Sequence, residues 1–265
     1  MCGIVGLVDT RYNRPVDRGL LSRMNGSQFH RGPDEGGLHV EAGVGLGHRR
    51  LSIIDLSSGQ QPLFNEDGSV VVVFNGEIYN FPDLVDELAR RGHRFRTRCD
   101  TEVIVHAWEE WGEDCVARFR GMFAFGLWDR NRQTLFLARD RLGVKPLYYA
   151  CLPDGVILFS SELKALNAHP GLDRTIDASA VEDYFAYGYV PEPKTIYRGA
   201  RKLPPGYTLT IARGKPLPAP REYWDVPFRP VGPLSESAAC AELIERLRES
   251  VKIRLISDVP LGAFL

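Results

Sequence analysis

The sequence predicts an α+β fold in which antiparallel sheets are packed between outer layers of helices. Short apolar runs rich in β-branched residues recur up to about residue 212, as is typical of buried strands. Tight turns join several of these runs, which favours antiparallel pairing over parallel βαβ units. Amphipathic helical stretches lie between other runs, and helices of this kind cover the outer faces of packed sheets.

Five runs are expected to form strands, at residues 2–8, 70–74, 122–128, 134–138 and 156–159. The four valines and one phenylalanine at 70–74 are typical of a strand that is buried on both faces. Residues 129–132 suit a hairpin turn between the third and fourth runs. Pro-Asp-Gly at 153–155 suits a turn before the last run.

Four helices are expected, at residues 83–91, 101–111, 177–187 and 235–255. The first two and the last place apolar residues on one face, at the spacing of an amphipathic helix. Gly92 and Gly112 follow the first two, at the position where a glycine commonly ends a helix. Asp177 is positioned to cap the third helix.

Prolines divide the chain into two parts. Six of them crowd residues 216–233, which excludes a regular helix or a central strand there. We therefore expect a first domain over residues 1–212, a proline-rich connector over 213–234 and the truncated start of a second domain over 235–265. Residues 257–265 are apolar and strand-like, and one helix with one strand is too little for a complete domain.

The composition excludes several classes of function. The formal net charge of the 265 residues is −1 with both signs interspersed, so neither a nucleic-acid partner nor an acidic membrane surface is expected. No apolar run reaches the roughly 18 residues of a membrane span, and the first residues do not read as a signal peptide, so a cytoplasmic location is expected. The five cysteines form no Cys/His pattern of zinc spacing, so no structural metal is expected.

Cys2 is the most informative residue, because removal of Met1 would leave a thiol and a free α-amino group on one residue. An α-amino group has a pKa of about 7.7–8.0, so near neutral pH it can act as the base for its own side-chain nucleophile. The alternative is that Cys2 is a small buried residue at the start of a strand, which is common for a free cysteine. The residue alone leaves both interpretations open.

Three further groups have the chemistry that a thiol amidase needs. Asn75 and Gly76 offer a side-chain amide and a backbone N–H as donors to an oxyanion, although Asn-Gly is also a common hairpin turn. Arg50 either binds a carboxylate bidentately or is a solvated arginine at a strand start. Asp100 either caps the helix that begins near residue 101 or pairs with a substrate ammonium. A thiol, an arginine and a carboxylate together fit L-glutamine.

A series of short motifs occurs in order along almost the whole chain. They are Cys-Gly-Ile-Val-Gly at 2–6, His-Arg-Gly-Pro-Asp at 30–34, Arg-Leu-Ser-Ile-Ile-Asp at 50–55, Phe-Asn-Gly-Glu-Ile-Tyr-Asn at 74–80, Asp-Thr-Glu-Val-Ile at 100–104, Arg-Gly-Met-Phe-Ala-Phe at 120–125, Arg-Asp-Arg-Leu-Gly at 139–143, Lys-Pro-Leu-Tyr-Tyr at 145–149 and Ser-Glu-Leu-Lys-Ala at 161–165. In this order they resemble the glutaminase domain of class II glutamine amidotransferases, specifically the asparagine synthetase (glutamine-hydrolysing) branch. The resemblance implies the four-layer αββα sandwich of N-terminal-nucleophile hydrolases, followed by the start of an α/β ATP-pyrophosphatase domain.

The resemblance also implies a role for each matching residue. Cys2 is the nucleophile, and Asn75 with Gly76 forms the oxyanion hole. The residues implied to hold glutamine are Arg50 at its α-carboxylate, Leu51, Ser52, Ile53 and Ile54 along the pocket, and Glu77 and Asp100 at its α-ammonium. Arg31 is expected either near the thiol or in a packing role within its turn. Leu265 would contact an adenine nucleotide, although the family's Ser-Gly-Gly-x-Asp-Ser pyrophosphate loop is not in the sequence.

The implied function is that of a glutamine-dependent asparagine synthetase. The glutaminase half uses no cofactor and forms a γ-glutamyl thioester. Ammonia then passes through a tunnel to aspartate, which ATP and Mg²⁺ activate in the part that is missing here. The implied partners are L-glutamine, aspartate and ATP, and homodimers occur in the family. Two alternatives stay open: an amidotransferase with another acceptor, such as a polysaccharide precursor, and a non-catalytic regulatory module.

Overall fold

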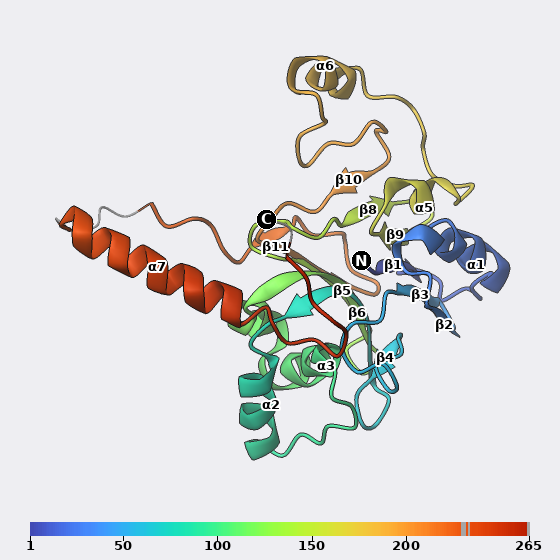
Figure 1. Cartoon of the computed structure of the whole chain (residues 1–265). Coiled ribbons are helices and arrows are strands. Elements are labelled where there is room, and N and C mark those ends of the chain that lie inside the picture. Colours follow the sequence, from blue (N-terminus) through green and yellow to red (C-terminus); the bar gives the residue numbers. More distant parts are fainter. Residues whose placement is uncertain (229–231, 233, 264–265) are drawn as a thin grey trace.

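Two six-stranded antiparallel sheets form the centre of the protein (Figure 1). The computed structural model describes residues 1–228, 232 and 234–263. The first sheet holds β1 (Gly3–Asp9), β2 (Glu35–Glu41), β3 (Val44–Arg50), β8 (Tyr148–Cys151), β9 (Val156–Ser160) and β10 (Arg201–Lys202), in the order β10-β8-β9-β1-β3-β2. The second sheet holds β4 (Leu63–Phe64), β5 (Val70–Ile78), β6 (Gly121–Asp129), β7 (Thr134–Arg139), β11 (Tyr207–Ala212) and β12 (Arg221–Glu222), in the order β12-β11-β7-β6-β5-β4.

Helices cover the outer face of each sheet. The first sheet is covered by α1 (Arg18–Gly26) and α5 (Leu163–Asn167), and the second by α2 (Phe81–Arg90), α3 (Asp100–Trp111) and α4 (Cys115–Arg118). Figure 1 shows α6 (Ala178–Tyr187) and α7 (Glu236–Lys252) projecting from this body. Two short 3₁₀ turns, η1 (Phe29–Arg31) and η2 (Gly112–Asp114), complete the set in the described part of the chain.

Three apolar clusters hold these layers together, one between the sheets and one under each helix layer. Strand β1 shows how the sequence divides its residues among them. Ile4 and Val8 belong to the cluster between the sheets, whereas Val5 and Leu7 belong to the cluster under α1 and α5. This two-residue alternation gives a central strand two apolar faces. The expected αββα sandwich is thereby confirmed.

The four expected helices are present, with ends that differ from the expected ones by three residues or fewer. Gly92 and Gly112 adopt positive φ values of 103° and 57°, which a glycine tolerates after a helix. The Asp177 carboxylate caps α6 by accepting a hydrogen bond from the Ser179 backbone N–H at 3.0 Å. Among the helices that the structure describes, none is both long and apolar enough to cross a membrane.

The structure corrects several expectations about the ends of elements. Asn75 lies inside β5 rather than after it, because pairing with β6 continues to Ile78, opposite Gly121. Arg50 ends β3 instead of opening a strand, and it is only 4% exposed, so it is not a solvated arginine. Residues 257–263 form no strand, since no described strand pairs with them.

The sheet also continues into the segment that was expected to be a connector. Residues of β12 pair with β11, with Tyr207 opposite Glu222 and Thr208 opposite Arg221. Tyr223 then packs against the cluster between the second sheet and its helices. Residues 229–231 and 233 of that segment lie outside the described residues.

The ring of Phe159 links the two sheets at a point where both strands carry glycine. A Cβ on Gly6 of β1 would lie 2.2 Å from its Cε1, and a Cβ on Gly126 of β6 would lie 2.4 Å from its Cε2. Phe159 is fully buried. The two glycines therefore make the room in which one aromatic ring can join both sheets.

Gly126→Ala should lower the free energy of unfolding by about 1–3 kcal/mol, because the added methyl overpacks a closed core. The double variant with Phe159→Leu should lose less free energy of unfolding than the sum of the two single losses. The smaller leucine leaves room for the added methyl group. Urea denaturation of the three variants measures both effects.

Gly26→Ala is the matched control, because an added Cβ there meets no atom within 4 Å. It should leave stability unchanged or slightly raised. Equal losses for Gly26→Ala and Gly126→Ala, or strict additivity with Phe159→Leu, would contradict this account of the interface.

Candidate active site

The backbone around Cys2 is fixed on several sides, although the residue lies next to the chain terminus. Strand β1 runs between β3 and β9 in the interior of the first sheet. The Ile4 N–H donates to Ser161 Oγ at 3.1 Å, and Gln28 Nε2 donates to the Ile4 carbonyl at 3.0 Å. Arg31 Nε donates to the carbonyl of Cys2 itself at 2.8 Å. Arg31 thus lies near the thiol and also holds the local backbone, so both of its expected roles meet in one contact.

The Cys2 side chain opens on a cavity of about 250 Å³. The sequence-predicted residues in its lining are Cys2, Arg50, Leu51, Ile53, Ile54, Asn75, Gly76, Glu77 and Asp100. Ser52 is not among the lining residues, and its backbone N–H donates to Asp34 Oδ2 at 2.9 Å. Leu265 lies outside the described residues. Both sheets and the first turn of α3 contribute to this one cavity.

The thiol of Cys2 is largely buried against the start of the 51–58 loop. The Leu51 N–H donates to its Sγ at 3.4 Å. Burial raises the pKa of the Cys2 thiol, while this hydrogen bond and the charge of Arg50 oppose that shift. Met1, which precedes it, is 59% exposed.

Asn75 presents an unused donor to the cavity. Its side chain is 1% exposed, and its Nδ2 has no hydrogen-bond partner among the described residues. Buried amide donors are almost always paired, so an unpaired one at a cavity wall indicates a group that a ligand completes. Gly76 follows it at a point where β5 lies close to β6, because a Cβ there would lie 2.2 Å from the Met122 carbonyl oxygen.

Arg50 is buried at the edge of the cavity and retains free donors. Its Nη1 donates to Glu35 Oε2 at 3.1 Å, and its Nη2 donates to the carbonyls of Ile54 and Asp55 at 3.0 and 2.6 Å. These bonds use three of the five N–H groups that a guanidinium carries. The arginine therefore fixes the 51–58 loop and can still bind an anion.

Two carboxylates face the same cavity without a cation bonded to either one in the described structure. Asp100 is the first residue of α3, and its Oδ2 accepts from the Ile78 N–H at 2.9 Å. Burial raises the pKa of Asp100 to about 7, and the nearby charge of Glu77 adds to that shift. Burial likewise raises the pKa of Glu77. A ligand ammonium between them would favour both ionised forms.

Two buried side chains that the sequence did not single out hold these groups in place. His48 on β3 contacts the carbonyl of Phe74 on β5 through Nε2 at 3.0 Å, and burial lowers the pKa of His48 to about 3. A neutral ring therefore joins the two sheets next to Asn75. Gln61 Oε1 accepts from the Phe74 N–H at 2.7 Å, while its Nε2 donates to Thr101 Oγ1 at 3.3 Å.

The 51–58 loop is tied to distant parts of the chain through Asp55, which adopts a positive φ of 51°. Its Oδ2 accepts from the Arg98 N–H at 2.8 Å, and its own N–H donates to Asp258 Oδ2 at 2.7 Å. The Asp258 N–H in turn donates to the Ile53 carbonyl at 3.0 Å. Burial opposes the change, but hydrogen bonds from Ser58 and Arg98 lower the pKa of Asp55 to about 2.

The arrangement can attack an electrophile and stabilise the product of that attack. A thiol and an unpaired amide donor line the same cavity. An arginine and a pair of carboxylates provide sites for an anion and a cation. Such a set recognises a small zwitterion and places it beside a nucleophile.

Comparison with known proteins identifies a family with this chemistry. The model of the glutamine amidotransferase domain family matches residues 1–224. The matched segment, like β12, extends beyond residue 212, the expected end of the first domain.

Curated relatives match the chain along its whole length. The glutamine-hydrolysing asparagine synthetase 1 of Bacillus subtilis (strain 168) is 39% identical over 267 residues, which are 100% of this chain and 42% of the relative. The glutamine-hydrolysing asparagine synthetase 2 of Oryza sativa subsp. japonica is 36% identical over 267 residues, which are 100% of this chain and 39% of the relative. The chain thus spans about two fifths of the length of these relatives.

A solved structure shares the fold. The glutamine phosphoribosylpyrophosphate amidotransferase from B. subtilis, in complex with ADP and GMP, superimposes with a TM-score of 0.60. The match covers 84% of this chain and 49% of that chain, at 19% sequence identity. This likeness supports the N-terminal-nucleophile hydrolase sandwich that was expected from the sequence.

Gln61→Leu should lower the free energy of unfolding by about 1–3 kcal/mol, because it leaves the buried N–H of Phe74 without a partner. Gln60→Leu is the matched control, since Gln60 is exposed and bonds mainly to the Ser57 carbonyl. Guanidinium denaturation of both variants checks the difference. Indistinguishable midpoints would mean that the Gln61 bridge does not support the cavity wall.

Proposed function

The chain belongs to the glutamine amidotransferase domain family, and from that membership we propose that it hydrolyses L-glutamine to glutamate and ammonia through Cys2. The observation that carries the proposal is the unpaired amide of Asn75 in the same small cavity as the thiol. A scaffold module has no need to bury a polar donor without a partner, because such a group costs stability.

The charged groups of the cavity define how glutamine binds. Its α-carboxylate pairs with Arg50, which lines the cavity and keeps two N–H groups that the hydrogen bonds described above do not use. Its α-ammonium pairs with Asp100 and Glu77, neither of which has an ion-pair partner among the described residues, although the charge of Lys145 in the same cavity acts on Glu77. This leaves the side-chain amide directed at Cys2, with its oxygen toward Asn75 and the Gly76 backbone. Both ends of the zwitterion are matched, which favours a free amino acid over a peptide.

The reaction begins once Met1 is removed, because only then does Cys2 carry a free amino group. That amine takes the thiol proton, and the thiolate attacks the glutamine amide carbon. Asn75 and Gly76 donate to the oxyanion as it develops. The amine returns the proton to the leaving ammonia, and a γ-glutamyl thioester remains. Water activated by the same amine attacks the thioester, glutamate leaves, and the thiol is regenerated.

For the longer protein we propose asparagine as the product, with aspartate as the ammonia acceptor. The proposal rests on the names of the relatives that match the whole chain, both of which are asparagine synthetases. ATP and Mg²⁺ would activate the acceptor. The described residues 253–263 are irregular and form no phosphate-binding turn before a helix, so these residues do not fit the nucleotide and no step through it is assigned to them.

The surface of α7 supports the proposal that the chain is continued by a second unit. Four of its apolar residues are 53–59% exposed, namely Leu243, Ile244, Leu247 and Val251. A stripe of this kind is normally covered by another element. We propose that the remainder of the longer protein covers it, and transfer to an acceptor other than aspartate stays the second candidate.

The proposal is tested by glutamate release from L-glutamine with protein whose Met1 removal has been verified by intact mass. Cys2→Ala should abolish release. Asn75→Ala should lower kcat by about 10²–10³-fold while the fold is kept, because one oxyanion donor is lost. Release that persists in Cys2→Ala would exclude the thiol as nucleophile. A processed, folded parent that is inactive even in the longer gene product would favour the non-catalytic alternative.

The KM for glutamine should rise as the pH falls below about 7, approaching tenfold per pH unit. The sign follows from Asp100, whose carboxyl binds protons through this range in the free protein and must be ionised to hold the substrate ammonium.

Asp100→Asn isolates this dependence. The variant should have a high KM at pH 8 and should lose the rise in KM between pH 8 and pH 6. Its kcat should still fall as the pH drops, because protonation of the Cys2 α-amine removes the catalytic base. A KM for the parent that is flat over this range would show that Asp100 does not hold the ammonium.

A further inference from the structure

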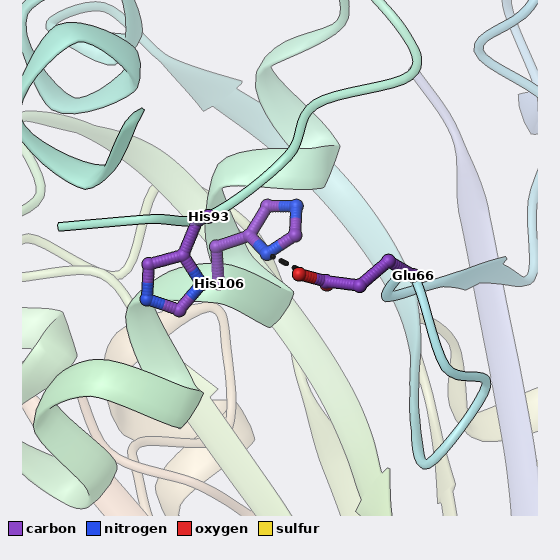
Figure 2. A group of neighbouring side chains, drawn as sticks. All are labelled: Glu66, His93 and His106. Atoms are coloured by element: carbon purple, nitrogen blue, oxygen red, sulfur yellow. Dashed lines mark ion pairs between the residues drawn. The ribbon is translucent and has the colours of Figure 1, made fainter. Parts of the chain in front are cut away.

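A second cluster of polar side chains lies outside the glutamine cavity. Figure 2 shows Glu66 from the turn between β4 and β5, His93 from the segment between α2 and α3, and His106 on α3. One nitrogen or oxygen of each lies within 4.8 Å of one from each of the other two. None of the three lines the cavity around Cys2.

His106 is buried without conventional partners. Its side chain is fully buried, and neither ring nitrogen has a hydrogen-bond partner among the described residues. The same holds for Glu66 Oε2 and Glu109 Oε2, which also face this ring. Four unpaired polar atoms in one buried spot are unusual, because burial of a polar group without a partner is costly.

Two separations in the cluster match the edges of a metal coordination sphere, and a third is slightly longer. Glu66 Oε2 and Glu109 Oε2 each lie 3.3 Å from His106 Nδ1, and Glu109 Oε2 lies 3.8 Å from His93 Nδ1. Zinc bonds to histidine nitrogen and carboxylate oxygen are about 2.0–2.2 Å long, so tetrahedral ligand atoms stand about 3.3–3.6 Å apart. The atoms are too far apart for good hydrogen bonds and well spaced for a shared cation.

The opposite nitrogen of each ring faces a further carboxylate. His93 Nε2 lies 3.5 Å from Glu110 Oε2, and His106 Nε2 lies 3.6 Å from Glu102 Oε1. Histidines that bind a metal through one nitrogen usually donate the N–H of the other to a carboxylate or carbonyl. The arrangement therefore orients both rings with Nδ1 toward the centre of the cluster.

The charge of the cluster favours a cation. Arg91 pairs with Glu110 at 2.7 Å. Glu66, Glu102 and Glu109 have no lysine or arginine ion pair within the described part of the chain. Asn65 Nδ2 donates to Glu109 Oε1 at 2.7 Å, which leaves Oε2 directed at the histidines. Two imidazoles with several carboxylates are a ligand set that suits a divalent ion of the zinc type.

We propose that this cluster binds one Zn²⁺ ion through His93 Nδ1, His106 Nδ1 and Glu66 Oε2, and that Glu109 Oε2, which contacts both histidines but lies outside this group of three, moves in as the fourth ligand. Four protein ligands make a closed, structural site. The ion ties the β4–β5 turn and the segment after α2 to α3, the helix that carries Asp100 at its first residue. The proposal differs from the expectation of no structural metal, which rested on short spacing motifs, because these ligands come from three separate elements and follow no such motif.

Zinc binding to the tag-free 265-residue chain tests the proposal. The Cys2→Ala background is used, since an N-terminal thiol is itself a metal ligand. Competition with a chromogenic chelator gives stoichiometry and Kd, and substitution by Co²⁺ gives the visible absorption of a tetrahedral site. We expect one ion per chain and a rise in Tm on addition of Zn²⁺, because the ion binds the folded state.

His93→Gln, made in the same background, should weaken Kd by at least about 100-fold, more than the loss of an outer carboxylate partner costs. It should also remove the Co²⁺ absorption and the rise in Tm. His39→Gln is the matched control. His39 also pairs with a glutamate, Glu41, at 3.2 Å, but it does not belong to the cluster of Glu66, His93 and His106. It should change none of the three readouts.

Glu66→Gln serves as a second ligand variant in a surface turn, should His93→Gln fail to fold. The proposal is overturned if the Cys2→Ala chain binds no Zn²⁺ with tetrahedral Co²⁺ absorption. It is equally overturned if both ligand variants bind as the His39→Gln control does. Either result would mean that protons on the histidines, and not a metal, balance the carboxylates.

Discussion

The structure depends on the placement of its first strand in the interior of a sheet. Chain termini usually fray, so a nucleophile at residue 2 would be poorly positioned unless the following residues were held. Strand β1 is paired on both sides, by β3 and by β9, and its two faces enter two different apolar clusters. Ser161, Gln28 and Arg31 then bond the backbone on either side of Gly3. These contacts hold Cys2 in place although it lies next to the chain terminus.

Several polar groups of the cavity lack partners in the free protein, and these groups determine which ligand it binds. Asn75 keeps an unpaired donor, Arg50 keeps unused N–H groups, and Asp100 and Glu77 are two neighbouring carboxylates without an ion-pair partner among the described residues. Each of these unsatisfied groups lowers the stability of the free protein. A ligand with an acceptor, an anionic group and an ammonium at the right separations satisfies all of them at once. A ligand without one of these groups leaves a buried polar atom unpaired, which is penalised more strongly than a lost apolar contact.

Local sequence patterns were enough to predict the layers, four of the helices and five residues of the cavity, namely Cys2, Arg50, Asn75, Gly76 and Asp100. The other predicted lining residues were implied only by the resemblance to a family. They were weaker for β2 and β3, where Gly36, Gly37, Gly45 and Gly47 interrupt the β-branched pattern on which strand prediction depends. His48 and Gln61 escaped notice because their importance lies in single long-range bonds to Phe74, which no spacing rule encodes. The histidine and glutamate cluster was missed for the same reason: its members meet only after β4, α2 and α3 have packed.

The hydrogen bonds of Asp258 to Ile53 and Asp55 have a thermodynamic consequence. The 51–58 loop supplies part of the cavity wall, so its conformation is shared between the first 100 residues and a segment near residue 258. Whatever displaces Asp258 must break both bonds and redistribute the population of loop conformations. Linkage is reciprocal, so a ligand that holds the loop also restrains the C-terminal segment by the same free energy. Through Asp55 and Asp258, occupancy of the cavity is therefore coupled to the conformation of the segment that follows α7.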